Sequence, residues 1–217
     1  PLDPVSGLNI GGESRPILAA DQNNPTTVDA ALAQEKGPAL FDVRQRFVFT
    51  FGLELPKLQS SSAAARAVLG GWQLNGIFQA QTGFPFTVND SVLSITYLTQ
   101  RPNVSCDPNN GPKTEAKWFA TECFVRRTNL AETAAPGNQG RNVVRGPGFN
   151  KTDLSLFKNF GFGANGRHQV QFRLEAFNVF DQVVYGRPGN AIGTATFGQI
   201  TTAEDGRTLQ LGLKYSF

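Results

Sequence analysis

The chain has 217 residues, enough for one sizeable domain, with 40% hydrophobic residues, 17% charged residues and a formal net charge of +3. No run of about 18 apolar residues occurs, which excludes a membrane-spanning helix. The positive charges are scattered rather than gathered in a basic run or basic helix, which argues against a nucleic-acid-binding protein.

We expect residues 1–41 to form the tail of another outer loop, with a short helix over Ala30–Lys36. The chain opens at Pro1, contains no Met and shows no signal peptide. We therefore expect it to be a segment of a longer precursor.

Five stretches alternate apolar and polar residues with a period of two, which predicts β-strands. In the first stretch, Phe47, Phe49 and Leu53 share one face and Thr50 the other, and Pro56 ends the run. The predicted strands cover residues 42–56, 72–86, 150–160, 167–180 and 207–217.

The last predicted strand indicates the fold class. Its apolar face consists of Leu209, Leu211, Leu213, Tyr215 and Phe217, and the chain stops there. Soluble proteins seldom end on such a strand, whereas outer-membrane β-barrels do so routinely, with one face towards lipid and the other towards a polar lumen. We therefore predict an all-β, antiparallel, up-and-down transmembrane β-barrel, in which this strand acts as the barrel assembly signal.

The predicted connections alternate in length, as they do in such barrels. Residues 57–70 and 161–166 are short links, whereas residues 87–149 and 182–206 are long and rich in Gly, Pro, Asn and Thr. Counting back from a periplasmic C-terminus places both long connections outside the cell. Five strands cannot close a barrel, for which eight is about the minimum, so we expect the missing strands before Pro1.

Charged residues alternate onto the polar faces of the predicted strands. They are predicted to face the lumen as cross-strand ion pairs rather than to act in acid–base chemistry. These lumen-facing charges are Arg44, Arg46, Glu54, Arg173 and Glu175.

Aromatic residues gather near the ends of the predicted strands, as in the girdles of membrane barrels. We expect Trp72, Tyr215 and Phe217 at the inner membrane boundary. The outer boundary is predicted to carry Phe84, Phe86 and Phe180.

Two motifs invite other readings. The segment 161–166, Gly-Phe-Gly-Ala-Asn-Gly, fits a dinucleotide-binding fingerprint, but the helix that such a site needs is replaced by a period-two pattern. Cys106 and Cys123 are compatible with a disulfide, a metal pair or two unrelated thiols. Zinc is disfavoured because the chain has a single His, His168, and a disulfide is favoured if the region is extracellular. We find no catalytic arrangement and predict neither enzyme activity nor a cofactor.

Several short motifs, in order, resemble the C-terminal barrel of Oar-like TonB-dependent outer-membrane receptors, which carry a carboxypeptidase-regulatory-like domain. They are Glu35–Phe47, Glu54–Pro56, Gly71–Gln73, Gln81–Phe86, Trp118–Phe119, Cys123–Phe124, Gly140–Asn142, Arg145–Asn150, Asp153–Lys158, Arg173–Phe180 and the terminal strand. The resemblance implies a barrel of about 22 strands around an N-terminal plug. Its implied partners are outer-membrane lipid, the TonB system acting through the plug, the barrel-assembly machinery and an unidentified ligand.

Three functions remain open from the sequence. The first is part of a TonB-dependent transporter or receptor for a bulky nutrient. The second is an outer-membrane scaffold or adhesion protein that binds partners through its long loops. The third is a soluble extracellular β-sandwich, which predicts that the apolar strand faces meet another sheet.

Overall fold

The computed structural model describes residues 36–56, 62, 65, 68–90, 101–126, 137–163 and 167–217. All but the last residue of the helix expected over Ala30–Lys36 lies outside these ranges. The chain divides into two compact units. The sheet unit comprises residues 44–82, 148–184 and 204–217, and the loop unit comprises residues 1–43, 83–147 and 185–203.

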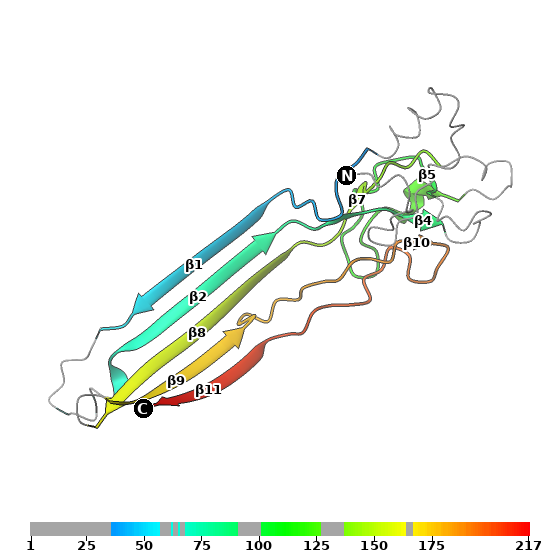
Figure 1. Cartoon of the computed structure of the whole chain (residues 1–217). Coiled ribbons are helices and arrows are strands. Elements are labelled where there is room, and N and C mark those ends of the chain that lie inside the picture. Colours follow the sequence, from blue (N-terminus) through cyan, green and yellow to red (C-terminus); the bar gives the residue numbers. More distant parts are fainter. Residues whose placement is uncertain are drawn as a thin grey trace, which may run out of the picture. The chain divides into compact units, whose positions relative to one another are not determined.

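The sheet unit is an open, five-stranded antiparallel sheet (Figure 1). In spatial order its strands are β1 (Arg46–Glu54), β2 (Trp72–Gln81), β8 (Phe149–Phe162), β9 (His168–Phe177) and β11 (Thr208–Ser216). Because β1 and β11 are edge strands, each presents one row of backbone groups that this sheet does not pair.

The strand register aligns the alternation of all five strands. One row consists only of leucines, one from each strand: Leu53, Leu74, Leu156, Leu174 and Leu211. The adjacent row points to the opposite face and contains Gly52, Asn75, Ser155, Glu175 and Gln210. Since paired residues share a face, the sheet has one apolar face and one polar face.

The predicted strand over 72–86 is too long. β2 ends at Gln81, and the next two-residue strand, β3 (Pro85–Phe86), pairs with β7 (Val144–Arg145) in the loop unit. Phe86 is therefore buried in the loop unit, and its predicted place in the outer aromatic girdle is wrong. The apolar–polar alternation continues through Phe84 and Phe86, which is why the predicted strand extends too far. Phe86 packs in the core of the loop unit instead.

The other strand limits differ by a few residues. β1 begins at Arg46 rather than at residue 42, and β9 ends at Phe177 rather than at residue 180. Asn178 adopts a left-handed φ of 50°, which a strand does not accommodate, and its side chain bonds the backbone of Gln182 across the turn.

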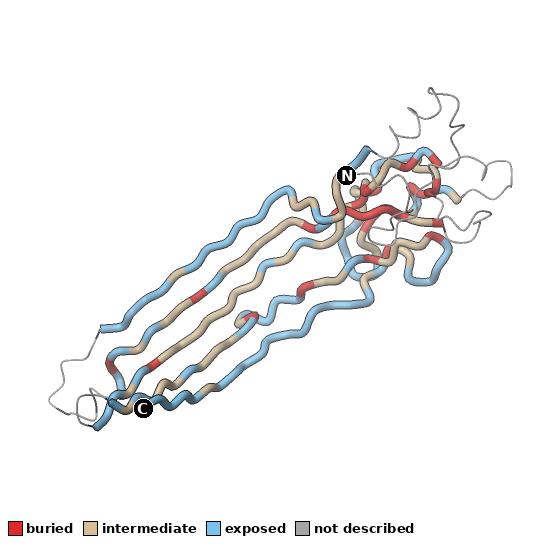
Figure 2. Tube along the Cα trace, viewed as in Figure 1, coloured by how far each residue is buried: buried red, intermediate tan, exposed pale blue. Residues whose placement is uncertain are grey.

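The loop unit is folded, although the sequence predicted only long connections over 87–149 and 182–206. Besides β3 and β7 it contains β4 (Asn89–Asp90) paired with β10 (Ala191–Ile192), β5 (Asn103–Val104) paired with β6 (Phe124–Val125), and the 3₁₀ helix η2 (Thr121–Cys123). The core of this unit consists of buried Phe86, Val88, Phe119, Phe124, Val144 and Ile192. Figure 2 shows the buried stretches, drawn in red, gathered mainly in this unit. Among the described residues, no helix has the length and apolar character to cross a membrane.

Candidate functional site

The apolar face of the sheet unit is most exposed on its edge strands, whereas Leu74, Leu156 and Leu174 on the central strands are half-buried. On β11, Leu209 is 65% exposed, Leu211 71% and Leu213 75%. A soluble β-sandwich would bury these side chains against a second sheet. A contiguous apolar surface of this kind instead suits contact with lipid.

The polar face is rich in amide side chains, which both donate and accept hydrogen bonds. By register they are Gln73, Asn75, Gln79, Gln81, Asn159, Gln169, Gln171 and Gln210. Gln171 Nε2 donates to Asn159 Oδ1 at 3.0 Å, across the β8–β9 pair. The face can therefore form hydrogen bonds without carrying a strong field of one sign.

Four of the five predicted lumen charges lie on this polar face: Arg46, Glu54, Arg173 and Glu175. Arg44 lies before β1 begins, so it has no place on a strand face.

The predicted cross-strand ion pairing is wrong for Arg173 and Glu175. Their side chains pair along β9, with Arg173 Nη1 3.8 Å from Glu175 Oε1. The guanidinium also lies 4.7 Å from the ring centre of Phe157, its register partner on β8. Stacking on this aromatic ring occupies the cross-strand position, and sequence reasoning did not place a Phe on the polar face.

A polar hollow of about 370 Å³ lies at one end of the polar face. Glu54, Gln73, Phe157 and Asn159 line it from three neighbouring strands, together with Leu55, Pro56, Gly71 and Trp72. The combination of carboxylate, amides and ring suits a polar organic group better than a metal ion. Within the described ranges, no group of three or more His, Cys, Asp or Glu side chains gathers to hold a metal.

Aromatic rings gather at the sheet end that carries Phe217. Phe162, His168 and Tyr215 form a stack, and the ring centres of Tyr215 and Phe217 lie 5.7 Å apart. His168 Nδ1 and the Tyr215 hydroxyl are 2.7 Å apart, and Trp72 contacts Phe172 edge-on. Rings with a polar edge are typical of a membrane–water boundary.

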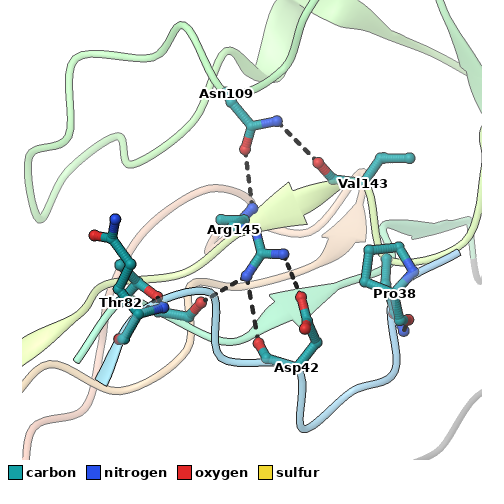
Figure 3. Close-up of polar contacts among 9 residues, drawn as sticks. Pro38, Asp42, Thr82, Asn109, Val143 and Arg145 are labelled. Atoms are coloured by element: carbon teal, nitrogen blue, oxygen red, sulfur yellow. Dashed lines mark hydrogen bonds and ion pairs between the residues drawn. The ribbon is translucent and has the colours of Figure 1, made fainter. Parts of the chain in front are cut away.

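Arg145 organises the polar contacts of the loop unit (Figure 3). Its guanidinium pairs with Asp42 Oδ2 at 2.5 Å and donates to the carbonyls of Asp42 and Gly83. Its backbone N–H donates to Asn109 Oδ1, and Asn109 Nδ2 donates to the Val143 carbonyl. The side chain thus joins Asp42 and Gly83 to β7, and the backbone N–H of Arg145 adds Asn109.

Cys106 and Cys123 form a disulfide in the loop unit, with their Cα atoms 5.1 Å apart. In the chain-entropy treatment, closing a loop of this size stabilises the folded state by roughly 3 kcal/mol. Gly161–Gly166 does not precede a helix: β9 begins at His168, so a dinucleotide site of the expected kind has no helix N-terminus, although residues 164–166 lie outside the described ranges.

Among the described residues of the loop unit, three titratable groups have shifted pKa values. The Tyr185 hydroxyl donates to Glu115 Oε1 at 2.6 Å, and this bond raises the pKa of the phenol. A hydrogen bond from Lys117 lowers the pKa of Glu122. Partial burial lowers the pKa of Lys113, against an opposing effect of Asp107. The Tyr185 and Glu122 shifts run away from neutral pH, as expected of structural contacts.

Comparison with known proteins agrees with a sheet that has one apolar and one polar face. Residues 11–210 match a family model described as an outer membrane beta barrel domain. No curated protein and no solved structure matches the chain significantly.

Proposed function

Because the chain belongs to the outer membrane β-barrel domain family, we propose that it forms the C-terminal barrel portion of a TonB-dependent transporter for a bulky nutrient. Family membership places the protein in the bacterial outer membrane. The observation that carries the proposal is the register of the sheet, which aligns an apolar row and a polar row across all five strands.

The barrel requires more strands than the five of this sheet. Unpaired backbone groups in hydrocarbon cost several kcal/mol each, so the free edges of β1 and β11 must both be paired within the membrane. We infer a barrel of about 22 strands, which is wide enough to hold a plug domain. The plug would couple the barrel to TonB and so to the energy of the inner membrane.

The amide-rich polar face supports a hydrogen-bonding nutrient such as a glycan or a peptide. Amide groups match hydroxyl and peptide groups as donors and as acceptors. The polar hollow beside Phe157 adds a ring, against which an apolar part of such a molecule could pack.

An outer-membrane scaffold or adhesion protein is the second candidate. The folded loop unit favours it, because a hydrophobic core and a disulfide give a defined surface for binding a partner. Transport and adhesion differ in their need for energy, and this difference can be measured.

The test compares the parent bacterium with a strain that lacks the whole gene, supplied with fluorescent oligosaccharides or peptides. For a transporter, deletion abolishes uptake of one nutrient class, and collapse of the proton gradient in the parent has the same effect. Normal uptake with a loss of surface attachment would reject the transporter and favour the adhesion protein.

Phe217 is predicted to serve barrel assembly rather than ligand binding. An exposed apolar strand suits recognition by edge pairing, and the barrel-assembly machinery is the partner that we propose. Deleting Phe217, which is 90% exposed, should lower the amount of folded, heat-modifiable protein in the outer membrane. The protein that does insert should bind its ligand unchanged. Replacing Ser216 by Ala is the matched control, and normal insertion with weakened binding would contradict the assignment.

A further inference from the structure

The segment Val68–Gly70, which precedes β2, lies against the apolar face of the sheet. Trp72 and Lys158 are register partners, and both share the face of Leu74 and Leu156. Trp72 Nε1 donates to the Val68 carbonyl at 2.9 Å, and Lys158 Nζ donates to the Gly70 carbonyl. Because both donors lie on the apolar face, the Val68–Gly70 backbone lies on that side of the sheet.

Lys158 is an exception on this face. A lysine facing lipid is costly, but its side chain is buried here and its ammonium lies 5.3 Å from the ring centres of both Trp72 and Phe160. The Gly70 carbonyl completes this environment. The ammonium therefore has its partners inside the protein, and its hydrogen bond holds the Val68–Gly70 segment against the sheet.

The segment held by Lys158 carries two exposed apolar side chains. Val68 is 56% exposed and Leu69 61%, and both have helical backbone. Gly71 then adopts a φ of 72°, a conformation that glycine tolerates best, and the chain turns into β2. If this turn lay in water, the side chains of Val68 and Leu69 would be exposed to solvent without any apolar partner.

We propose that the segment Val68–Trp72, held by Lys158, is a membrane anchor that inserts Val68 and Leu69 into the phospholipid headgroup–acyl boundary. The segment is continuous with the apolar face and lies at the sheet end that carries the aromatic rings of Phe162 and Tyr215. Apolar side chains beside aromatic rings are what this boundary accommodates. The proposal rests on the outer-membrane location and is independent of transport.

The test measures the depth of a nitroxide at Leu69. Full-length protein is folded into phosphatidylethanolamine–phosphatidylglycerol vesicles, and a Leu69→Cys label is probed with oxygen and with a water-soluble nickel complex. Leu211→Cys provides the lipid-facing control and Glu54→Cys the polar-face control. The oxygen-to-nickel ratio at Leu69 should exceed that at Glu54 several-fold. A ratio equal to that at Glu54 would overturn the anchor.

The role of Lys158 is tested in the same vesicles. Lys158→Met keeps most of the side-chain volume but removes the bond to the Gly70 carbonyl, so the Leu69 label should gain nickel access while the Leu211 label does not. An unchanged Leu69 label would show that Lys158 does not hold the segment. If Lys158→Met fails to insert, Trp72→Phe removes the bond to the Val68 carbonyl while keeping an aromatic ring beside Lys158, and the same gain is expected.

Discussion

Replacing Phe119 by Ala is expected to lower the free energy of unfolding of the loop unit by about 3–5 kcal/mol, the usual cost of truncating a buried aromatic ring. Phe119 is fully buried, and its ring centre lies 5.8 Å from that of Phe86, 5.7 Å from Phe124 and 5.3 Å from Phe197. Removing it opens a cavity that three neighbouring rings cannot fill without leaving their own contacts.

The measurement is hydrogen exchange in the full-length protein, read at the amides of β6 and β7. Phe41→Ala in the same unit is the control: Phe41 is 78% exposed, so its truncation should cost less than about 0.5 kcal/mol. Equal protection in both variants would show that the loop unit is not stabilised by this core.

Replacing Leu211 by Arg is expected to cost about 2–4 kcal/mol if the position lies near the membrane midplane, and less towards either boundary. Leu211 belongs to the leucine row of the apolar face, where a guanidinium would meet hydrocarbon.

Gln210→Arg is the matched control, since Gln210 is the preceding residue of β11 and faces the polar side. The free energy of unfolding is measured by titrating the vesicle-inserted protein with guanidinium chloride. The value for Leu211→Arg should be lower than that for Gln210→Arg by most of the predicted cost. If both variants lost the same stability, the faces would be assigned wrongly or the sheet would not meet lipid.

The sequence alone could predict the two faces of the sheet, because strand side chains alternate whatever the neighbouring strand is. The period-two pattern around Leu53, Leu74, Leu174 and Leu211 was sufficient to place each residue on the apolar face. Which leucine lies beside which depends on register, and register is a property of paired strands.

The exceptions to the alternation depended on neighbours that are distant in sequence. Lys158 shares the apolar face because Trp72, Phe160 and the Gly70 carbonyl surround its ammonium. Arg173 does not form the predicted cross-strand ion pair, because the ring of Phe157 occupies the neighbouring cross-strand position. No local pattern reveals these compensating contacts. The alternation of β8 could, however, have shown that Lys158 lies on the same face as Leu154 and Leu156.

The fold of the loop unit was decided by tertiary structure. Composition rich in Gly, Pro and Asn predicted long connections, but it could not show that the described parts of these connections share a core. Arg145 and Asp42, 103 residues apart, meet only once the chain has folded. Alternation is a local property that the sequence displays directly, whereas a core assembled from separate segments exists only through long-range packing, which local patterns do not encode.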